Sequence, residues 1–190
     1  NQIQNYIGTS AGSILSLLLC IGYTTNELFD FSYFFDFKKI LNDASLEIFV
    51  NSYGFNDHSN VSYIISRLLR KKKISKNITF KQLFFKTNKK LTITGTCVNE
   101  NKLYYFNYIN NPNMKIITAI LISCCIPVLF TPIKYKKKLW VDGGILNNYP
   151  INYFYKDIEN TIGIAIFNKN YEKKNYINNI LQYFKNLYNC

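Results

Sequence analysis

The stretch YIGTSAGSILSLLLC, residues 6–20, decides the fold that this sequence predicts. Its first two residues are expected to end a β-strand, and residues 11–20 to form a helix that is apolar on most faces and therefore buried. Between them GTSAG fits the pattern G-x-S-x-G, in which the small residues Gly8, Ala11 and Gly12 allow a sharp turn. Such a turn places Ser10 at a helix N-terminus, where unpaired backbone N–H groups favour negative charge.

Three interpretations of this pentapeptide are open. Ser10 is a nucleophile, or Ser10 or Thr9 caps the helix after a glycine turn, or the turn binds a phosphate. The sequence contains neither G-x-x-x-x-G-K-[ST] nor G-x-G-x-x-G, which argues against the phosphate site. Because short glycine patterns arise by chance, the pentapeptide alone does not separate the nucleophile from the cap.

A serine nucleophile needs a base beside it, and the usual base is histidine. The chain has one histidine, His58, in the polar stretch of residues 54–60, where a surface loop is expected. In α/β-hydrolases the histidine follows both the serine and the acid, and no histidine follows residue 58. We therefore expect no Ser-His-Asp triad.

A carboxylate is the remaining candidate base. In WVDGG, residues 140–144, an apolar run ends at Asp142, and Gly143 and Gly144 allow the backbone to pass close to another element. Taken alone, a solvated Asp-Gly turn is the better explanation of this acid.

Three blocks of the sequence together resemble the patatin-like phospholipase family. GTSAG is similar to the family's serine elbow. SCCIPVLFTP, residues 123–132, is similar to its S-x-A-x-P-x-x-F-x-P block, with Cys125 where alanine is usual. VDGGILNNYP, residues 141–150, is similar to its D-G-G-x-x-x-N-x-P block. The order and spacing agree from about residue 6 to about residue 167.

The resemblance implies a three-layer α/β/α sandwich that hydrolyses carboxylic esters of phospholipids or other acyl lipids. It implies that Ser10 is the nucleophile and Asp142 its base, without histidine, metal or organic cofactor, and that an acyl-enzyme forms. The Ala11 N–H would be one oxyanion donor. The family's glycine-rich oxyanion loop would precede residue 1, so we expect the N-terminal part of the domain to be missing and the fragment to be inactive by itself.

Two hypotheses from other classes remain beside the enzyme. The first is a catalytically inactive module with the same fold that binds lipid or membrane surfaces. The second is an α/β module that binds anions. A covalent serine probe separates the enzyme from both.

The net charge of +12 suits a nucleic acid or an anionic membrane as partner. Zinc-finger spacing, an RNP-like motif and a helix-turn-helix signature are all missing from the sequence, so nucleic acid is not an expected partner. Two basic runs, residues 67–73 and 134–138, favour an anionic membrane surface, and the second run is expected to border the mouth of the site. Coding bias of an AT-rich genome explains the charge about equally well.

The five cysteines are odd in number, irregularly spaced and without a C-x-x-C pair. They predict reduced, mostly buried thiols in an intracellular protein, either cytoplasmic or peripheral to a membrane, and with one histidine they predict no zinc site.

Residues 116–133 carry no charge, but Pro127 and Pro132 interrupt them. This segment therefore predicts a buried helix and then an extended segment, not a membrane span.

The remaining elements follow from local patterns. Strands that alternate with buried helices predict an α/β fold in one domain, residues 1–170, followed by an amphipathic helix within residues 171–190. The predicted elements are a helix after the capping box Thr24–Glu27, a helix over 61–71 capped by Asn60, a helix over 80–86 after the box Thr79–Gln82, a hairpin of strands 91–98 and 102–107, a helix over 114–125, a strand over 139–142, a buried strand over 161–167 and a helix over 176–188.

Overall fold

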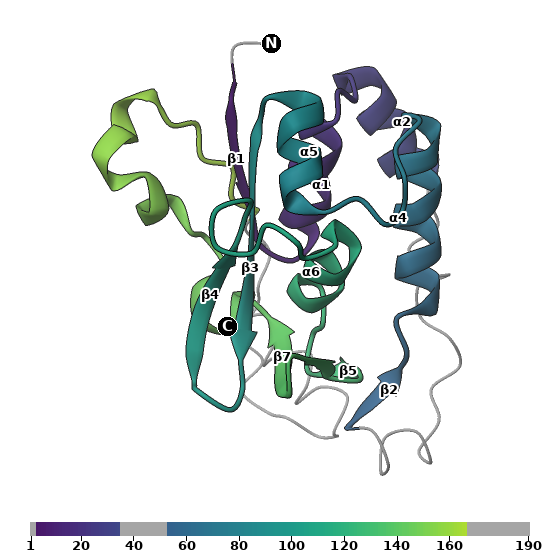
Figure 1. Ribbon diagram of the computed structural model, residues 1–190, viewed down its shortest axis with the longest axis vertical. Helices are drawn as coiled ribbons and strands as arrows, with labels where there is room; N and C mark the ends of the chain where they lie inside the picture. The colour runs from purple at the N-terminus through teal and green to yellow at the C-terminus, as the bar shows by residue number, and fades with distance from the viewer. Residues whose placement is uncertain (1–2, 35–52, 167–190) are drawn as a thin grey trace, which may run out of the picture. The chain divides into compact units, whose positions relative to one another are not determined.

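The computed structural model describes residues 3–34 and 53–166, and the chain divides into two compact units, residues 1–150 and 151–190 (Figure 1). The described elements of the first unit are β1 (Asn5–Gly8), α1 (Ala11–Cys20), α2 (Thr25–Phe34), β2 (Gly54–Asn56), α4 (Ser59–Lys71), α5 (Phe80–Thr87), β3 (Lys90–Cys97), β4 (Lys102–Phe106), α6 (Ile116–Ser123), β5 (Val128–Phe130), β6 (Ile133–Tyr135), β7 (Lys138–Asp142) and α7 (Gly144–Asn147).

Strand β3 organises the main sheet of this unit. It pairs in parallel with β1 and antiparallel with both β4 and β7, and β6 pairs with β7. In this register Gly8, the last residue of β1, lies opposite Ile93, and Asp142, the last residue of β7, lies opposite Gly95. The ends of β1 and β7 are thus brought to positions two residues apart on one strand.

Helices cover this sheet and fill the core with aliphatic side chains. Figure 1 shows α1, α5 and α6 gathered beside β3. The side chains of Leu17, Ile93 and Ile120 are fully buried, and they come from a helix, the central strand and a second helix. A central sheet flanked by helices confirms the predicted α/β class.

Local capping signals predicted two helix starts. At α5 the Thr79 hydroxyl accepts from the Gln82 N–H, and the Gln82 side chain accepts from the Thr79 N–H. The same reciprocal pair joins Thr24 and Glu27 before α2, at 2.9 and 3.2 Å. Both capping boxes are confirmed.

The predicted cap of α4 is wrong. The helix begins at Ser59, one residue before Asn60, the residue predicted to cap it. The Asp57 carboxylate accepts from the Ser59 N–H at 3.0 Å and from its hydroxyl at 2.6 Å. The Asp57 carboxylate, two residues before the start of α4, therefore accepts the N–H of the first helical residue.

The segment 116–133 folds as a buried helix, α6, followed by the short strands β5 and β6, as predicted. Within residues 3–34 and 53–166, no helix has the length and apolar character needed to cross a membrane.

The second unit is described over residues 151–166. Its first part is 3₁₀-helical, Ile151–Asn160, with non-helical backbone at Phe154 and Asp157. The buried strand predicted over 161–167 is wrong for residues 161–166, which form no strand and are mostly exposed; Ile166 is 95% exposed. Isoleucines alternate here as in a strand, but no strand in the described parts of the chain pairs with them. The predicted helix over 176–188 and the boundary at 170 lie outside the described residues.

Candidate active site

Ser10 lies at the turn between β1 and α1, with φ 53° and ψ −129°. A residue other than glycine in such a sparsely populated conformation costs about 1–3 kcal/mol, so the surrounding structure must hold it. Its N–H donates to the Ser123 hydroxyl oxygen at 2.9 Å. Its carbonyl oxygen accepts from the Ser13 hydroxyl at 2.6 Å and the Ser13 N–H at 2.8 Å. Both backbone polar groups of the strained residue are therefore held by neighbours.

The two elbow glycines differ in what they allow. A Cβ at Gly8 would lie 2.2 Å from the Gly12 carbonyl oxygen and 2.6 Å from the Ser13 nitrogen, so β1 passes the first turn of α1 too closely for any side chain. A Cβ at Gly12 would meet no atom within 4 Å. Close packing therefore explains why Gly8 has no side chain, whereas no contact explains the glycine at position 12. Ala11, between Ser10 and Gly12, is exposed.

Asp142 ends β7 as a buried side chain, 4% exposed. Its N–H donates to the Cys125 carbonyl oxygen at 2.8 Å, and its Oδ1 accepts from the Gly144 N–H at 2.7 Å. Burial raises the pKa of this carboxyl above its ordinary value, whereas a side-chain hydrogen bond with Ser10 and the bond from the Gly144 N–H lower it. The structure therefore places the Ser10 side chain close enough to the Asp142 carboxyl to lower its pKa.

The glycines after Asp142 make room for β3 and for the turn itself. A Cβ at Gly143 would lie 2.2 Å from the Thr94 hydroxyl oxygen. A Cβ at Gly144 would lie 3.0 Å from Asn148 Oδ1 and 3.1 Å from Asp142 Oδ1. The two glycines thus let the chain turn close against β3 while Gly144 donates its N–H to the carboxylate.

A pair of buried threonines joins the two sides of the site, and sequence reasoning missed it. The hydroxyl oxygens of Thr9 and Thr94 are 2.7 Å apart, and the Thr9 hydroxyl donates to the Asn147 carbonyl oxygen at 3.3 Å. Since Thr9 has one hydroxyl proton, Thr94 is the donor between the two. The only available signal was the alternation of threonines in LTITGTC, which predicts a strand but no partner.

His58 lies in the short loop between β2 and α4, as predicted, but it is not a fully exposed surface residue, and its contacts are with Phe130 and Thr131 rather than with Ser10 or Asp142. Its ring is half-buried, stacks on Phe130 with 5.4 Å between ring centroids, and its Nε2 is 2.7 Å from the Thr131 carbonyl oxygen. Burial lowers the pKa of the imidazole. These contacts tie the start of α4 to the strand β5.

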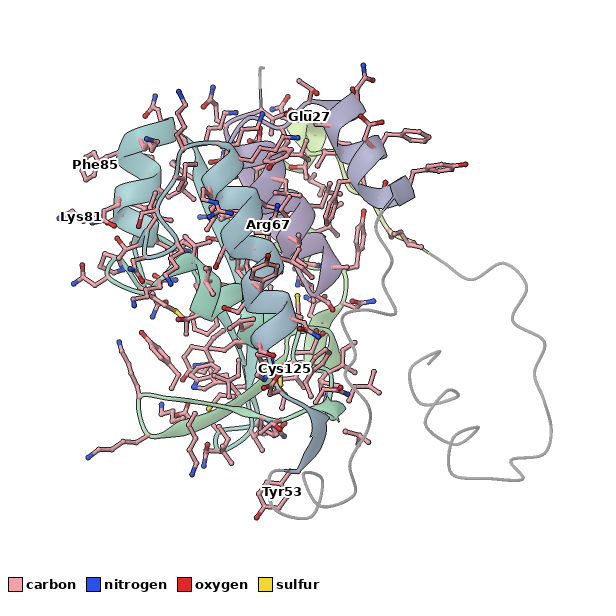
Figure 2. The ribbon with its side chains drawn as sticks, turned by 90° about the vertical axis from the view of Figure 1, so that its right-hand side faces the viewer. Glu27, Tyr53, Arg67, Lys81, Phe85 and Cys125 are labelled. Atoms are coloured by element: carbon pink, nitrogen blue, oxygen red, sulfur yellow. The ribbon has the colours of Figure 1, made fainter. Side chains whose placement is uncertain are left out.

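The four described cysteines are free thiols. Cys124 and Cys125 lie near Asp142, and Figure 2 labels the second of them. Burial, and after it the charge of Asp142, raises the pKa of both thiols to about 12, so neither is a thiolate at neutral pH. Cys190 lies outside the described residues. Nowhere in residues 3–34 and 53–166 do three or more cysteine, histidine or acidic side chains gather as a metal site would require.

The basic run at residues 134–138 forms the turn between β6 and β7, with Lys136 and Lys137 exposed at its tip. Asp142 lies at the other end of β7, four residues after Lys138, which is about 13 Å at the rise of an extended strand. The run therefore does not border Asp142 directly, because β7 separates the two.

The geometry defines a class of site: a serine on a strand-to-helix turn near an aspartate at a strand end, with the chain's one histidine bonded to the Thr131 carbonyl oxygen instead. Residues 1–155 match the family model described as patatin-like phospholipase, and the chain belongs to this family.

Two viral proteins are similar to most of the chain. It is 35% identical over 176 residues to "Probable lipid hydrolase 463L" of Invertebrate iridescent virus 6, a match that covers 92% of this chain and 58% of that protein. It is 31% identical over 172 residues to protein R571 of Acanthamoeba polyphaga mimivirus, covering 90% and 57%. The chain thus spans less than two thirds of the length of these relatives.

The crystal structure of VipD from Legionella pneumophila is similar in fold. The TM-score is 0.56 at 15% sequence identity, and the match covers 77% of this chain and 41% of VipD.

Proposed function

We propose that the protein is a lipid acyl hydrolase of the phospholipase A type, a serine hydrolase that cleaves carboxylic esters with Ser10 as nucleophile and Asp142 as base. The observation that carries the proposal is that the end of α6 holds the backbones of Ser10 and Asp142, through bonds of 2.9 and 2.8 Å, while the Ser10 side chain lowers the pKa of the buried Asp142 carboxyl. Family membership and the relative named as a probable lipid hydrolase support acyl lipids as the substrate class.

The reaction follows from this pair. Ser10 Oγ bonds to the acyl carbon while its proton passes to Asp142, and the bond from that carbon to the alcohol oxygen then breaks as the alcohol takes the proton. Water next attacks the acyl-enzyme and gives a proton to Asp142, which returns it to Ser10 Oγ as the fatty acid leaves. A raised carboxyl pKa makes Asp142 a better base than a solvated aspartate.

One oxyanion donor is proposed from the elbow itself. The Gly12 N–H already donates to the Thr9 carbonyl oxygen at 2.9 Å, whereas Ala11, the residue after the nucleophile, is exposed at the first position of α1. The first N–H groups of a helix have no partner within the helix, so the Ala11 N–H can face an oxyanion.

Exposed apolar side chains on the two helices that follow the pair suit an acyl chain. The helices α1 and α7 begin directly after Ser10 and after the turn at Asp142. Each exposes apolar residues: Leu15 on α1, and Ile145 and Leu146 on α7. An acyl chain would cover these side chains and remove their apolar surface from water.

A fluorophosphonate probe tests the nucleophile in the full-length protein. We expect the probe to modify Ser10, and Ser10→Ala to lose both the labelling and the hydrolysis of a phospholipid. Ser16→Ala is the control, since Ser16 is a second serine of α1 whose hydroxyl donates to the Ile7 carbonyl oxygen, at 3.0 Å. A folded protein that is not labelled and releases no fatty acid would contradict the enzyme.

A catalytically inactive module that binds an anionic membrane is the second candidate, and exposed cations favour it. Arg67, Arg70 and Lys71 line, with Leu68, a shallow hollow of about 320 Å³ on α4, and Figure 2 shows Arg67 on the side of this helix that faces the viewer. Lys72 does not add to this surface, because its Nζ is 2.8 Å from Glu27 Oε2. Membrane binding by these cations is also compatible with the enzyme, which would then act in the cytoplasm or at a membrane surface.

A further inference from the structure

The segment Ser123 to Cys125, at the end of α6, contacts the backbones of both proposed catalytic residues. The Ser123 hydroxyl oxygen accepts from the Ser10 N–H at 2.9 Å. Two residues later, the Cys125 carbonyl oxygen accepts from the Asp142 N–H at 2.8 Å. One short stretch of chain therefore holds the nucleophile on one side and the base on the other.

This segment is itself firmly placed. The Cys124 N–H donates to the Ile120 carbonyl oxygen at 2.9 Å and the Cys125 N–H to the Ile122 carbonyl oxygen at 3.1 Å, so both residues continue the hydrogen bonding of α6. Ser123 is 0% exposed. A buried side chain at the end of a packed helix has little freedom, and its hydroxyl oxygen is a fixed point.

Ser10 needs such a point because of its backbone. Its φ of 53° and ψ of −129° persist only when neighbours hold them, and the Ser123 hydroxyl oxygen is the acceptor for its N–H. Without that oxygen, the N–H would lose its partner and the turn could relax toward an ordinary conformation. Relaxation would swing Ser10 Oγ away from Asp142, which Cys125 holds independently.

We propose that Ser123 is a positioning residue, which sets the distance between Ser10 Oγ and Asp142 by fixing the strained elbow to the segment that also holds Asp142. The inference rests on the proposed function. Ser123 contacts the N–H of Ser10 rather than its reacting oxygen, so its role is in geometry and not in proton transfer.

The test compares Ser123→Ala with Ser16→Ala in the full-length protein. Each substitution removes one buried hydroxyl that forms a hydrogen bond with a backbone group. The partner of Ser123 is the Ser10 N–H, whereas the partner of Ser16 is the Ile7 carbonyl oxygen. We expect kcat for phospholipid hydrolysis to fall roughly 10- to 100-fold in Ser123→Ala, with KM within about twofold of the wild type, because small misplacement of a reacting atom is costly. A kcat that matches the Ser16→Ala value would overturn the proposal.

A second pair of variants removes the question of packing. Ser123→Thr and Ser123→Val have nearly equal volume and differ in the hydroxyl, so they suffer the same crowding. We expect Ser123→Thr to retain several-fold more kcat than Ser123→Val. Equal kcat values in these two variants would show that volume, and not the hydrogen bond, matters at this position.

A readout without activity separates this inference from the proposed function. Amide hydrogen exchange of the peptide that contains Ser10 is expected to accelerate at least fivefold in Ser123→Ala and to stay unchanged in Ser16→Ala. If the wild type hydrolyses no ester while exchange responds in this way, the proposed function fails and the hold of Ser123 on the elbow stands. Unchanged exchange in Ser123→Ala overturns the inference whatever the activity.

Discussion

Asp142 combines burial with a charge, and the two conflict. A carboxylate in an apolar setting loses hydration, which is the main reason that its pKa is raised. A solvated carboxylate would be more stable but a weaker base. Asp142 is therefore a residue at which stability and the proposed activity are expected to oppose each other.

Asp142→Asn is expected to abolish most ester hydrolysis, by about 10²–10⁴-fold, because the amide cannot accept the Ser10 proton. The double variant with Ser10→Ala should lose little more than either single variant, since the two residues act as a unit. His58→Ala is the control, and its activity per folded molecule should match the wild type. An effect of His58→Ala as large as that of Asp142→Asn would contradict the Ser-Asp pair.

The same substitution is expected to raise the melting temperature near neutral pH. A carboxyl whose folded pKa exceeds its unfolded value destabilises the fold once both states are ionised, and this cost disappears as pH falls through the folded pKa. The amide oxygen that Asp142→Asn introduces would still accept from the Gly144 N–H. Thermal unfolding of both proteins between about pH 4 and pH 8 measures the effect, and a gain that grows on acidification would contradict it.

At the scale of elements, single residues determine how closely the strands and helices around the site pack. The close approach of β1 to α1 depends on Gly8, and the link from β1 to β3 depends on a hydroxyl pair. These contacts place the ends of strands that are distant in sequence. Two matched pairs of variants test them.

Gly8→Ala is expected to destabilise the protein by about 1–3 kcal/mol, because its Cβ meets backbone atoms that cannot move aside without shifting α1. Gly12→Ala is the matched variant in the same turn. It has open space at its Cβ and exchanges glycine for the best helix former, so it should stabilise the fold by up to about 1 kcal/mol. Denaturant unfolding measures the free energy of unfolding of both variants. Equal changes in the two variants would contradict this prediction.

Thr94→Val and Thr96→Val form a second matched pair on β3. Thr94 donates to Thr9, so its substitution should cost about 0.5–1.5 kcal/mol. The Thr96 hydroxyl is buried and has no hydrogen-bond partner among the described residues, so Thr96→Val should be neutral or stabilising. Unfolding free energies of the two variants give the answer, and a larger loss in Thr96→Val would disprove the assignment.

For the whole molecule, the net charge of +12 matters most where cations are exposed and far from acidic side chains. Arg67 and Arg70 on α4 meet this condition best. Lys71 is exposed but its Nζ lies 3.8 Å from a Glu27 oxygen, and the Nζ of Lys72 lies closer still, at 2.8 Å. The charge in the sequence is thus a poorer guide to a membrane surface than the distribution of charge in the structure.

Binding to vesicles that contain phosphatidylserine is expected to weaken as salt rises, because exposed charges are screened. Replacing Arg67, Arg70 and Lys71 together by glutamine should weaken it by up to about 1 kcal/mol per residue. Replacing Lys72 alone is the control and should change binding less. Co-sedimentation measures this, and equal binding to neutral and anionic vesicles would leave coding bias as the explanation of the charge.

Sequence patterns succeeded where the cause of structure is local. The helix over residues 11–20, the two capping boxes and the hairpin were predictable because hydrophobic spacing and cap chemistry act within a few residues. The strand predicted over 161–167 was wrong because alternating isoleucines describe a strand only when another strand pairs with them. The partial burial of His58 was missed for a similar reason, since its contacts, Phe130 and Thr131, are distant in sequence.

By itself, the sequence determined the α/β class, the serine at its strand-to-helix turn and, through three motif blocks, the family. Only the tertiary structure decided what surrounds that serine. The pairing of β1 and β7 with β3 brings Ser10 to Asp142, and the end of α6 holds both. Contacts between elements that are separate in the sequence leave no local pattern in the chain, because the packing of whole elements, and not the propensity of any one segment, creates them.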